Sequence, residues 1–215
     1  MKRFPHDRSS RALTLTELLV VIDVVAMLFV LLVPLPSRKY EIARRVACHN
    51  NLKSTGLSFR LFATDNSDRF PMAVSTNEGG SMEYVERGNA FRHFWVMSNE
   101  LSSPKVLICP ADTRQFATNW FKLGDENVSY FVAVDAHEIK PQLLLSGDRN
   151  ITNGVIPLGR VLVLRTNQPV GWTKEVHRHV GNVALADASV LITTGSQMQR
   201  QLRNGETNSQ RVVLP

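Results

Sequence analysis

The longest apolar run of the chain lies near its N-terminus. Residues 13–33 read LTLTELLVVIDVVAMLFVLLV, contain no Gly or Pro, and include only two charged side chains, Glu17 and Asp23. As an α-helix these residues would extend about 31 Å at 1.5 Å per residue, which matches the hydrocarbon thickness of a bilayer. The pattern therefore predicts a membrane-spanning helix over residues 13–33.

A helical pattern continues after this run. Apolar residues recur at steps compatible with a 3.6-residue period, at Ile42, Val46, Leu52, Phe59 and Ala63. Pro34 cannot donate its backbone hydrogen bond and predicts a bend, and turn-forming residues after Thr64 predict the helix end. We therefore expect one long helix from Leu13 to Thr64, whose second half packs one face on the rest of the chain. Gly56 is either a site of close packing or a weak point, and we favour packing.

From Phe70 onward the pattern changes to short segments separated by turn-forming residues. Short helices are predicted at 90–101 and 195–203. Strands are predicted at 106–110, 129–134, 143–146 and 161–164, and as a β-hairpin at 182–186 and 189–193. The polar end up to Pro215 is predicted to be loose. One long helix followed by short strands indicates an α+β fold with an antiparallel sheet against the helix.

These patterns divide the chain into four parts. They are a basic leader (1–12), the apolar half of the helix (13–33), its second half (34–64) and a globular head (65–215). The net charge is +6, and the leader holds four basic residues against Asp7, so half of the excess lies there. Positive charge before an apolar span favours a cytoplasmic N-terminus, which would place the head outside the cytoplasm. The remainder has no basic run flanked by aromatic residues, so we expect no nucleic-acid partner.

The chain has two cysteines, Cys48 and Cys109. In an exported head they would form one disulfide, and in the cytosol they would remain buried thiols. The expected topology favours the disulfide, whose loop of roughly 60 residues would contribute about 4 kcal/mol by chain entropy. A pair of free buried thiols remains the alternative.

Glu17 lies about one turn inside the apolar segment and requires a physical reason. A carboxylate in the middle of a bilayer costs about 2.5–3.5 kcal/mol, and less near the edge. If the chain were cut before Leu13, the new amino group would be a cation within reach of Glu17 in a neighbouring copy. Such a pair would neutralise both charges and set the stagger of an assembly.

The stretch from Arg11 to Ile22 resembles the type IV prepilin signal. In that family a basic leader ends in Gly, a hydrophobic residue follows the cut, and Glu is the fifth residue of the mature chain. Here Glu17 is fifth from Leu13. The resemblance implies that a prepilin peptidase cuts before Leu13 and that the new N-terminus is methylated.

Three further positions bear on this resemblance. Pro34 is the twenty-second residue from the expected cut, where pilins commonly carry a helix-kinking proline. Ala12 stands where the family has Gly, and Asp23 stands where a small apolar residue is usual. Asp23 could pair with a partner chain or stay protonated, and the sequence leaves both possibilities open.

Later fragments are similar to pilin-like proteins of type II secretion-like systems. They are CHNNLKSTGLSFRLFATDN (48–66), ICPAD (108–112), SYFVAVDA (129–136), SGDRN (146–150) and HVGNVALADAS (179–189). The resemblance implies a pilin-like fold, with one long N-terminal helix packed on a small antiparallel β-sheet head. The family's A-D-G-S hairpin is A-D-A-S here, so a positive φ at that turn would strain Ala188.

We expect no catalytic site, cofactor or metal. His177 and His179, with Asp187 nearby, have no HExxH or GxSxG motif around them, so we interpret them as structural histidines. Some members of the resembling family hold calcium, but EF-hand spacing is lacking. We therefore expect solvated or turn-capping roles for the acidic loop residues, which are Asp112, Asp125, Glu126, Asp135, Asp148 and Asp187.

The resemblance thus implies a structural subunit of a type IV pilus-like or type II secretion pseudopilus assembly. Its partners would be a prepilin peptidase and other pilin or pseudopilin subunits. Its location would be the inner membrane, crossed once, with the N-terminus cytoplasmic and the head periplasmic or extracellular. The alternative is a monomeric membrane-anchored extracytoplasmic ligand-binding protein that never polymerises.

Overall fold

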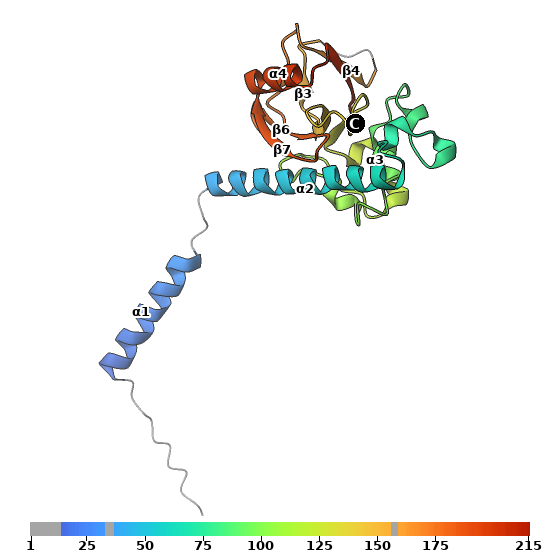
Figure 1. Cartoon of the computed structure of the whole chain (residues 1–215). Coiled ribbons are helices and arrows are strands. Elements are labelled where there is room, and N and C mark those ends of the chain that lie inside the picture. The colour runs from blue at the N-terminus through green and yellow to red at the C-terminus, as the bar shows by residue number, and fades with distance from the viewer. Residues whose placement is uncertain (1–13, 33–36, 156–158) are drawn as a thin grey trace, which may run out of the picture. The chain divides into compact units, whose positions relative to one another are not determined.

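A computed structural model describes residues 14–32, 37–155 and 159–215 (Figure 1). The chain divides into two compact units, Met1–Tyr40 and Glu41–Pro215. The α-helices are α1 (Leu15–Leu32), α2 (Ser37–Asp65), α3 (Ala90–Trp95) and α4 (Gly195–Asn204). The strands are β1 (Tyr130–Ala133), β2 (Leu144–Asp148), β3 (Ile151–Thr152), β4 (Val161–Arg165), β5 (Gly171–Trp172), β6 (Val180–Leu185), β7 (Val190–Thr194) and β8 (Ser209–Val213). Short 3-10 helices lie between α2 and β1.

The first unit contains α1, which is apolar around its whole circumference. Its large apolar side chains from Leu15 to Val30 are all at least half exposed. The helix has 18 residues, and among the described residues no helix combines the length and apolar character needed to cross a membrane. The predicted membrane-spanning helix over 13–33 is therefore wrong, and so is the single-pass inner-membrane location with a cytoplasmic N-terminus and an outer head.

The structure also differs from the single helix that was expected between Leu13 and Thr64. α1 ends at Leu32 and α2 begins at Ser37, so there are two elements, and only α2 belongs largely to the second unit. Pro34 and the expected bend lie outside the described residues. The predicted pilin-like arrangement of one long helix on a small sheet is therefore wrong, and the structure is α+β with a larger sheet.

That sheet has six strands in the order β4-β8-β1-β2-β6-β7, and all its neighbouring pairs are antiparallel. β3 and β5 form a separate two-stranded sheet. The C-terminal strand β8 lies between β4 and β1, with Val213 opposite both Val161 and Val132. The prediction of a loose C-terminal end is therefore wrong.

Side chains from alternate positions of β1 enter two different hydrophobic cores. Tyr130 and Val132 belong to the core that contains the buried face of α2, including Leu52 and Phe59. Phe131 and Ala133 belong to the second core, which includes Met198 of α4. Because successive strand residues point to opposite faces, the central sheet is covered on both sides.

The predicted hairpin is present as β6 and β7, and its turn rests against α2. Ala188 in this turn has a φ of 61°, a left-handed conformation that strains any residue with a Cβ. A Cβ added to Gly56 would lie 3.2 Å from the Cβ of Ala188, and Lys53 Nζ donates a hydrogen bond to the Ala188 carbonyl at 2.8 Å. Gly56 therefore permits the close approach of helix and turn.

One histidine of the second unit, His93 on α3, is fully buried, and its Nδ1 lies 2.7 Å from Ser81 Oγ. Burial lowers the pKa of His93 from its ordinary value of 6.5 to about 4. The unfolded chain therefore binds a proton at His93 more tightly than the folded chain does. As a result, the free energy of unfolding is not reduced by His93 above about pH 6.5, and it falls as the pH drops toward 4. By this linkage His93 costs about 2 kcal/mol of stability at pH 5.

We predict that His93→Gln removes this acid sensitivity. The loss of unfolding free energy between pH 7 and pH 5 should be smaller by about 2 kcal/mol than in the native chain, measured by denaturant unfolding. His137→Gln, at an exposed position, serves as the matched control and should leave the loss unchanged. Equal losses in the native chain and His93→Gln would contradict the prediction.

Candidate functional site

The start of α1 is capped by a reciprocal pair of residues, Thr14 and Glu17. The backbone nitrogen and Oγ1 of Thr14 each donate to Glu17 Oε2 at 2.8 Å, and the Glu17 backbone nitrogen donates to Thr14 Oγ1 at 3.3 Å. This is a capping box, in which the residue before the helix and the third residue of the helix each accept a hydrogen bond from the other's backbone nitrogen. The sequence analysis missed this role, although Thr-x-x-Glu before an apolar run is its signature.

The expected processing and assembly site also includes Asp23, Ala12, Leu13 and Pro34. Asp23 lies exposed on α1. Ala12, Leu13 and Pro34 lie outside the described residues, so the expected cleavage position has no structural description. Of this predicted set, the structure therefore places Glu17 and Asp23 on one apolar helix.

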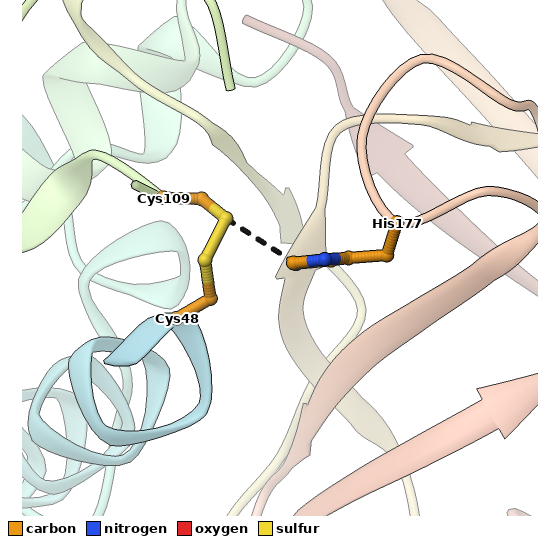
Figure 2. A group of neighbouring side chains, drawn as sticks. All are labelled: Cys48, Cys109 and His177. Carbon is orange, nitrogen blue, oxygen red and sulfur yellow. Dashed lines mark hydrogen bonds between the residues drawn. A yellow bond between two sulfur atoms is a disulfide. The ribbon is translucent and has the colours of Figure 1, made fainter. Parts of the chain in front are cut away.

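A disulfide between Cys48 and Cys109 joins α2 to the loop before β1, and Figure 2 shows it beside His177. Both cysteines are fully buried, with their Cα atoms 4.7 Å apart. Asn51 Nδ2 donates to the Ile108 carbonyl at 2.9 Å, which adds a second link between α2 and this loop. The expected strand at 106–110 is absent from this described loop, because a 3-10 helix, Pro104–Leu107, precedes Ile108.

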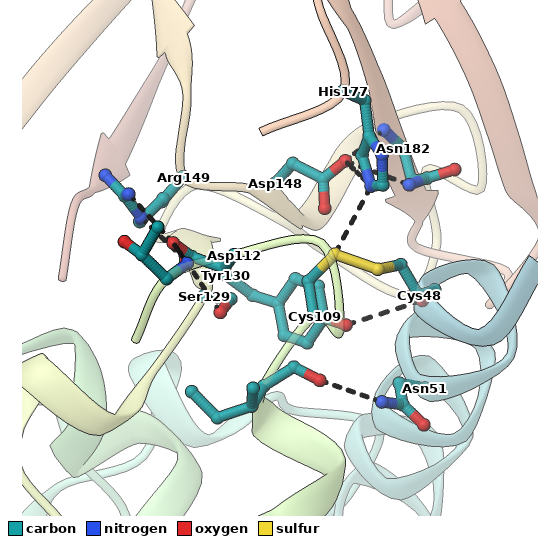
Figure 3. Close-up of a disulfide and its surroundings, with 12 residues drawn as sticks. Cys48, Asn51, Cys109, Asp112, Ser129, Tyr130, Asp148, Arg149, His177 and Asn182 are labelled. Atoms are coloured by element: carbon teal, nitrogen blue, oxygen red, sulfur yellow. Dashed lines mark hydrogen bonds and ion pairs between the residues drawn. A yellow bond between two sulfur atoms is a disulfide. The ribbon is translucent and has the colours of Figure 1, made fainter. Parts of the chain in front are cut away.

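His177 approaches the disulfide from the loop between β5 and β6. Its Nε2 lies 3.3 Å from Cys109 Sγ and 3.6 Å from Asp148 Oδ2 (Figures 2 and 3). Asp148 ends β2 and is fully buried, and its Oδ2 accepts hydrogen bonds from the backbone nitrogen and Nδ2 of Asn182 on β6 at 2.7 and 2.9 Å. Adjacent strands thus bring together residues that are far apart in the sequence.

The protonation states of this cluster follow from its burial. Burial raises the pKa of Asp148 to about 7, although hydrogen bonds from Asn182 act in the opposite direction. Burial also lowers the pKa of His177 to about 4, and the charge of Arg45 lowers it further. At neutral pH the imidazole is therefore uncharged, and one of its ring nitrogens carries a lone pair.

Sequence reasoning placed His177 with His179 and Asp187, but the structure assigns the three residues to different contacts. His179 Nδ1 lies 3.1 Å from the Trp172 carbonyl, and Asp187 Oδ1 accepts from the Ser189 backbone in the β6–β7 turn. His177 is instead buried at the disulfide. The local sequence carried no signal for this contact.

The loop that carries Cys109 is held by a buried ion pair. Arg149 Nε and Nη2 donate to the two oxygens of Asp112 at 2.8 and 2.9 Å, and Ser129 Oγ donates to the same carboxylate at 2.8 Å (Figure 3). Burial alone would raise the pKa of Asp112, but the hydrogen bonds from Arg149 and Ser129 lower it below its ordinary value. The pair therefore ties the cysteine loop to the end of β2.

The remaining acidic loop residues include two that also make specific protein contacts. Asp125 accepts from the Phe91 backbone nitrogen at 2.9 Å and forms an ion pair with Arg160. Asp135 pairs with Arg211 of β8 at 2.7 Å. These carboxylates anchor loops and the C-terminal strand.

A recess of about 190 Å³ opens beside the disulfide cluster. It is lined by residues of both signs that include Glu41, Arg44, Arg45, Lys174, Glu175 and Arg178, and it reaches His177 and Ala111. Arg45 Nη2 donates to the His177 carbonyl at 3.4 Å. The recess therefore reaches the residue whose ring contacts the disulfide.

Comparisons with known proteins add no assignment. Searches against family models, curated proteins and solved structures return no match to this chain. A functional interpretation therefore rests on the residues of the chain.

Proposed function

We propose that this chain is a structural subunit of a type IV pilus-like or type II secretion pseudopilus-like assembly, in which α1 packs against α1 of other copies. The observation that carries the proposal is the exposure of large apolar side chains on every side of this helix. Apolar area buried from water contributes about 25 cal/mol per Å², so a helix that is apolar all round is stabilised by being covered. The same helix in a second copy supplies a chemically matched cover.

Glu17 would give this packing a defined register. Processing by a prepilin peptidase between Ala12 and Leu13 would remove the basic leader and create an amine one residue before Thr14. Both bonds from Thr14 go to Glu17 Oε2, and a carboxylate can accept about four hydrogen bonds, so the cap leaves capacity for this cation. One Glu17 can therefore cap the start of its own helix and bind the amine of a neighbouring copy.

The proposal is tested by crosslinking in the cells that naturally make the chain. A photo-crosslinking residue at Val25, which is half exposed on α1, should give a ladder of covalent oligomers. In the same assay Glu17→Gln should lower oligomer yield about tenfold, because the charge that pairs with the amine is lost. Gln at this position retains the capping hydrogen bonds but lacks the negative charge.

Two controls separate charge pairing from helix capping. Thr14→Ala weakens the cap and leaves the carboxylate, so it should reduce the ladder far less than Glu17→Gln. Asp23→Asn changes the other acidic residue of α1 and tests whether that charge contributes. Monomeric crosslinking products alone would support a solitary binding protein and refute assembly, and a native ladder in Glu17→Gln would refute the pairing. A mature mass that begins at Met1 would refute processing.

A further inference from the structure

The disulfide cluster contains the donor set of a metal site. Cys48, Cys109 and His177 each offer one ligand atom, and these three atoms lie within 4.8 Å of one another in a buried place. Two sulfurs and one imidazole nitrogen are ligands that tetrahedral zinc sites use. In the oxidised chain the two sulfurs are bonded to each other, so they cannot bind a metal ion as thiolates.

We propose that the reduced form of this protein binds one zinc-class divalent metal ion through Cys48, Cys109, His177 and Asp148. The disulfide and the metal are then two alternative links between α2 and the Cys109 loop. This inference does not depend on the proposed assembly function, because every residue involved lies in the second unit.

One sulfur–nitrogen distance is already close to the one that a tetrahedral ion requires. Zn–S bonds of about 2.3 Å and Zn–N bonds of about 2.0–2.1 Å separate sulfur and nitrogen by about 3.6 Å. Cys109 Sγ and His177 Nε2 are now 3.3 Å apart, so they must move only a few tenths of an ångström. The two sulfurs would separate to about 3.8 Å after reduction, because each cysteine side chain can then turn about its Cα–Cβ bond.

Asp148 provides the fourth ligand. Its Oδ2 lies 3.6 Å from His177 Nε2, and within the part of the chain that the structure describes its buried Oδ1 has no hydrogen-bond partner. A buried polar atom without a partner is costly, and a metal ion would satisfy it. Asn182 donates to the other oxygen, Oδ2, and so fixes the carboxylate beside His177.

The charges around the cluster are compatible with this ligand set. Two thiolates and one carboxylate exceed the charge of a divalent ion by one negative unit. The guanidinium of Arg45 lies beside His177, where it donates to the carbonyl of that residue. Arg45 therefore offsets the residual negative charge, and the adjoining recess provides an entry path to the histidine.

The interconversion balances as a two-electron reduction. A dithiol or phosphine reductant gives two electrons to the Cys48–Cys109 bond and is itself oxidised, and the two sulfurs take up two protons. Metal binding then displaces both protons, because the ligands are thiolates. Reoxidation by a disulfide-bearing partner would reform the bond and release the metal.

The test uses the full chain, reduced with a phosphine under anaerobic conditions and titrated with Co²⁺. We expect one equivalent of Co²⁺ to bind, with a near-ultraviolet thiolate-to-cobalt band and the visible bands of tetrahedral cobalt. Zn²⁺ should displace the cobalt and abolish both signals. The oxidised chain should give neither signal, which separates this site from surface carboxylates.

Variants assign the ligands. His177→Ala should weaken Co²⁺ binding at least tenfold and Asp148→Asn about tenfold, whereas the exposed His137→Ala should not change it. Tryptophan fluorescence follows folding in parallel, and Zn²⁺ should raise the Tm of the reduced chain because it binds the folded state. A folded reduced chain without a thiolate–cobalt band would overturn the proposal. So would unchanged affinity in His177→Ala, or a reduced unfolded chain that Zn²⁺ does not refold.

Discussion

Replacing Cys48 and Cys109 together by alanine is expected to lower the free energy of unfolding of the second unit by about 4 kcal/mol. The disulfide closes a loop with a sequence separation of 61, and chain entropy assigns about this value to a loop of that length. Most small domains have only about 5–15 kcal/mol in total, so the variant should be close to unfolding at elevated temperature. Denaturant unfolding followed by tryptophan fluorescence measures the change, because Trp95, Trp120 and Trp172 all lie in this unit.

The matched control is chemical reduction of the native chain in the presence of a metal chelator. It breaks the same bond without changing a side chain, and it should give a similar loss. A loss below about 1 kcal/mol in both experiments would show that hydrogen bonds such as that from Asn51 to the Ile108 carbonyl hold the loop without the covalent link.

The β6–β7 hairpin shows what the residue pattern could predict. Its strands alternate around a short polar turn, and they pair in the register of Val180 with Thr194. The A-D-A-S comparison also indicated that a positive φ at this turn would strain Ala188, and the structure has a φ of 61° there. Such local features are determined by neighbouring residues, so the sequence alone is sufficient to find them.

Strand β8 shows what the pattern could not predict. Its sequence, SQRVV, begins with polar residues and gave the expectation of a loose end. In the structure the side chain of Gln210 is buried, accepts from the Leu144 backbone nitrogen at 3.1 Å and donates to the Leu144 carbonyl at 3.3 Å. A distant strand satisfies this polar side chain, so no local rule could assign it to the middle of a sheet.

The N-terminal segment was predicted correctly as helical but incorrectly as a span. The run over 13–33 suggested bilayer length, whereas α1 begins at Leu15, because Thr14 and Glu17 form the cap that starts the helix. The capping signature was present in the sequence, but Glu17 was interpreted only as an assembly residue.

The candidate metal site could be predicted only in part from the sequence. Counting cysteines was enough to suggest the pair, because two cysteines allow a single connectivity. His177 lies 68 residues from Cys109, and Asp148 reaches it only because β2 and β6 are neighbours. Strand order was not available from composition or spacing, so the four residues could not be grouped beforehand.

Arg149→Ala is expected to lower the free energy of unfolding by about 3 kcal/mol, the second-largest effect we predict. The Asp112 side chain is only 1% exposed. Removal of Arg149 leaves the Asp112 carboxylate buried without the guanidinium that donates to both of its oxygens. A buried charge that loses its partner keeps its desolvation cost and loses the compensating attraction. Denaturant unfolding at neutral pH, followed by tryptophan fluorescence, measures the loss.

Arg69→Ala is the matched control, because Arg69 pairs with Glu78 at 3.4 Å while both side chains are well exposed. Exposed pairs contribute about 0–1 kcal/mol, so this variant should be nearly neutral. Equal losses in the two variants would contradict a special role for the buried pair. Since Asp112 follows Cys109 by three residues, Arg149→Ala should also speed reduction of the disulfide by a phosphine, whereas Arg69→Ala should not. This rate would show directly whether the ion pair restrains the cysteine loop.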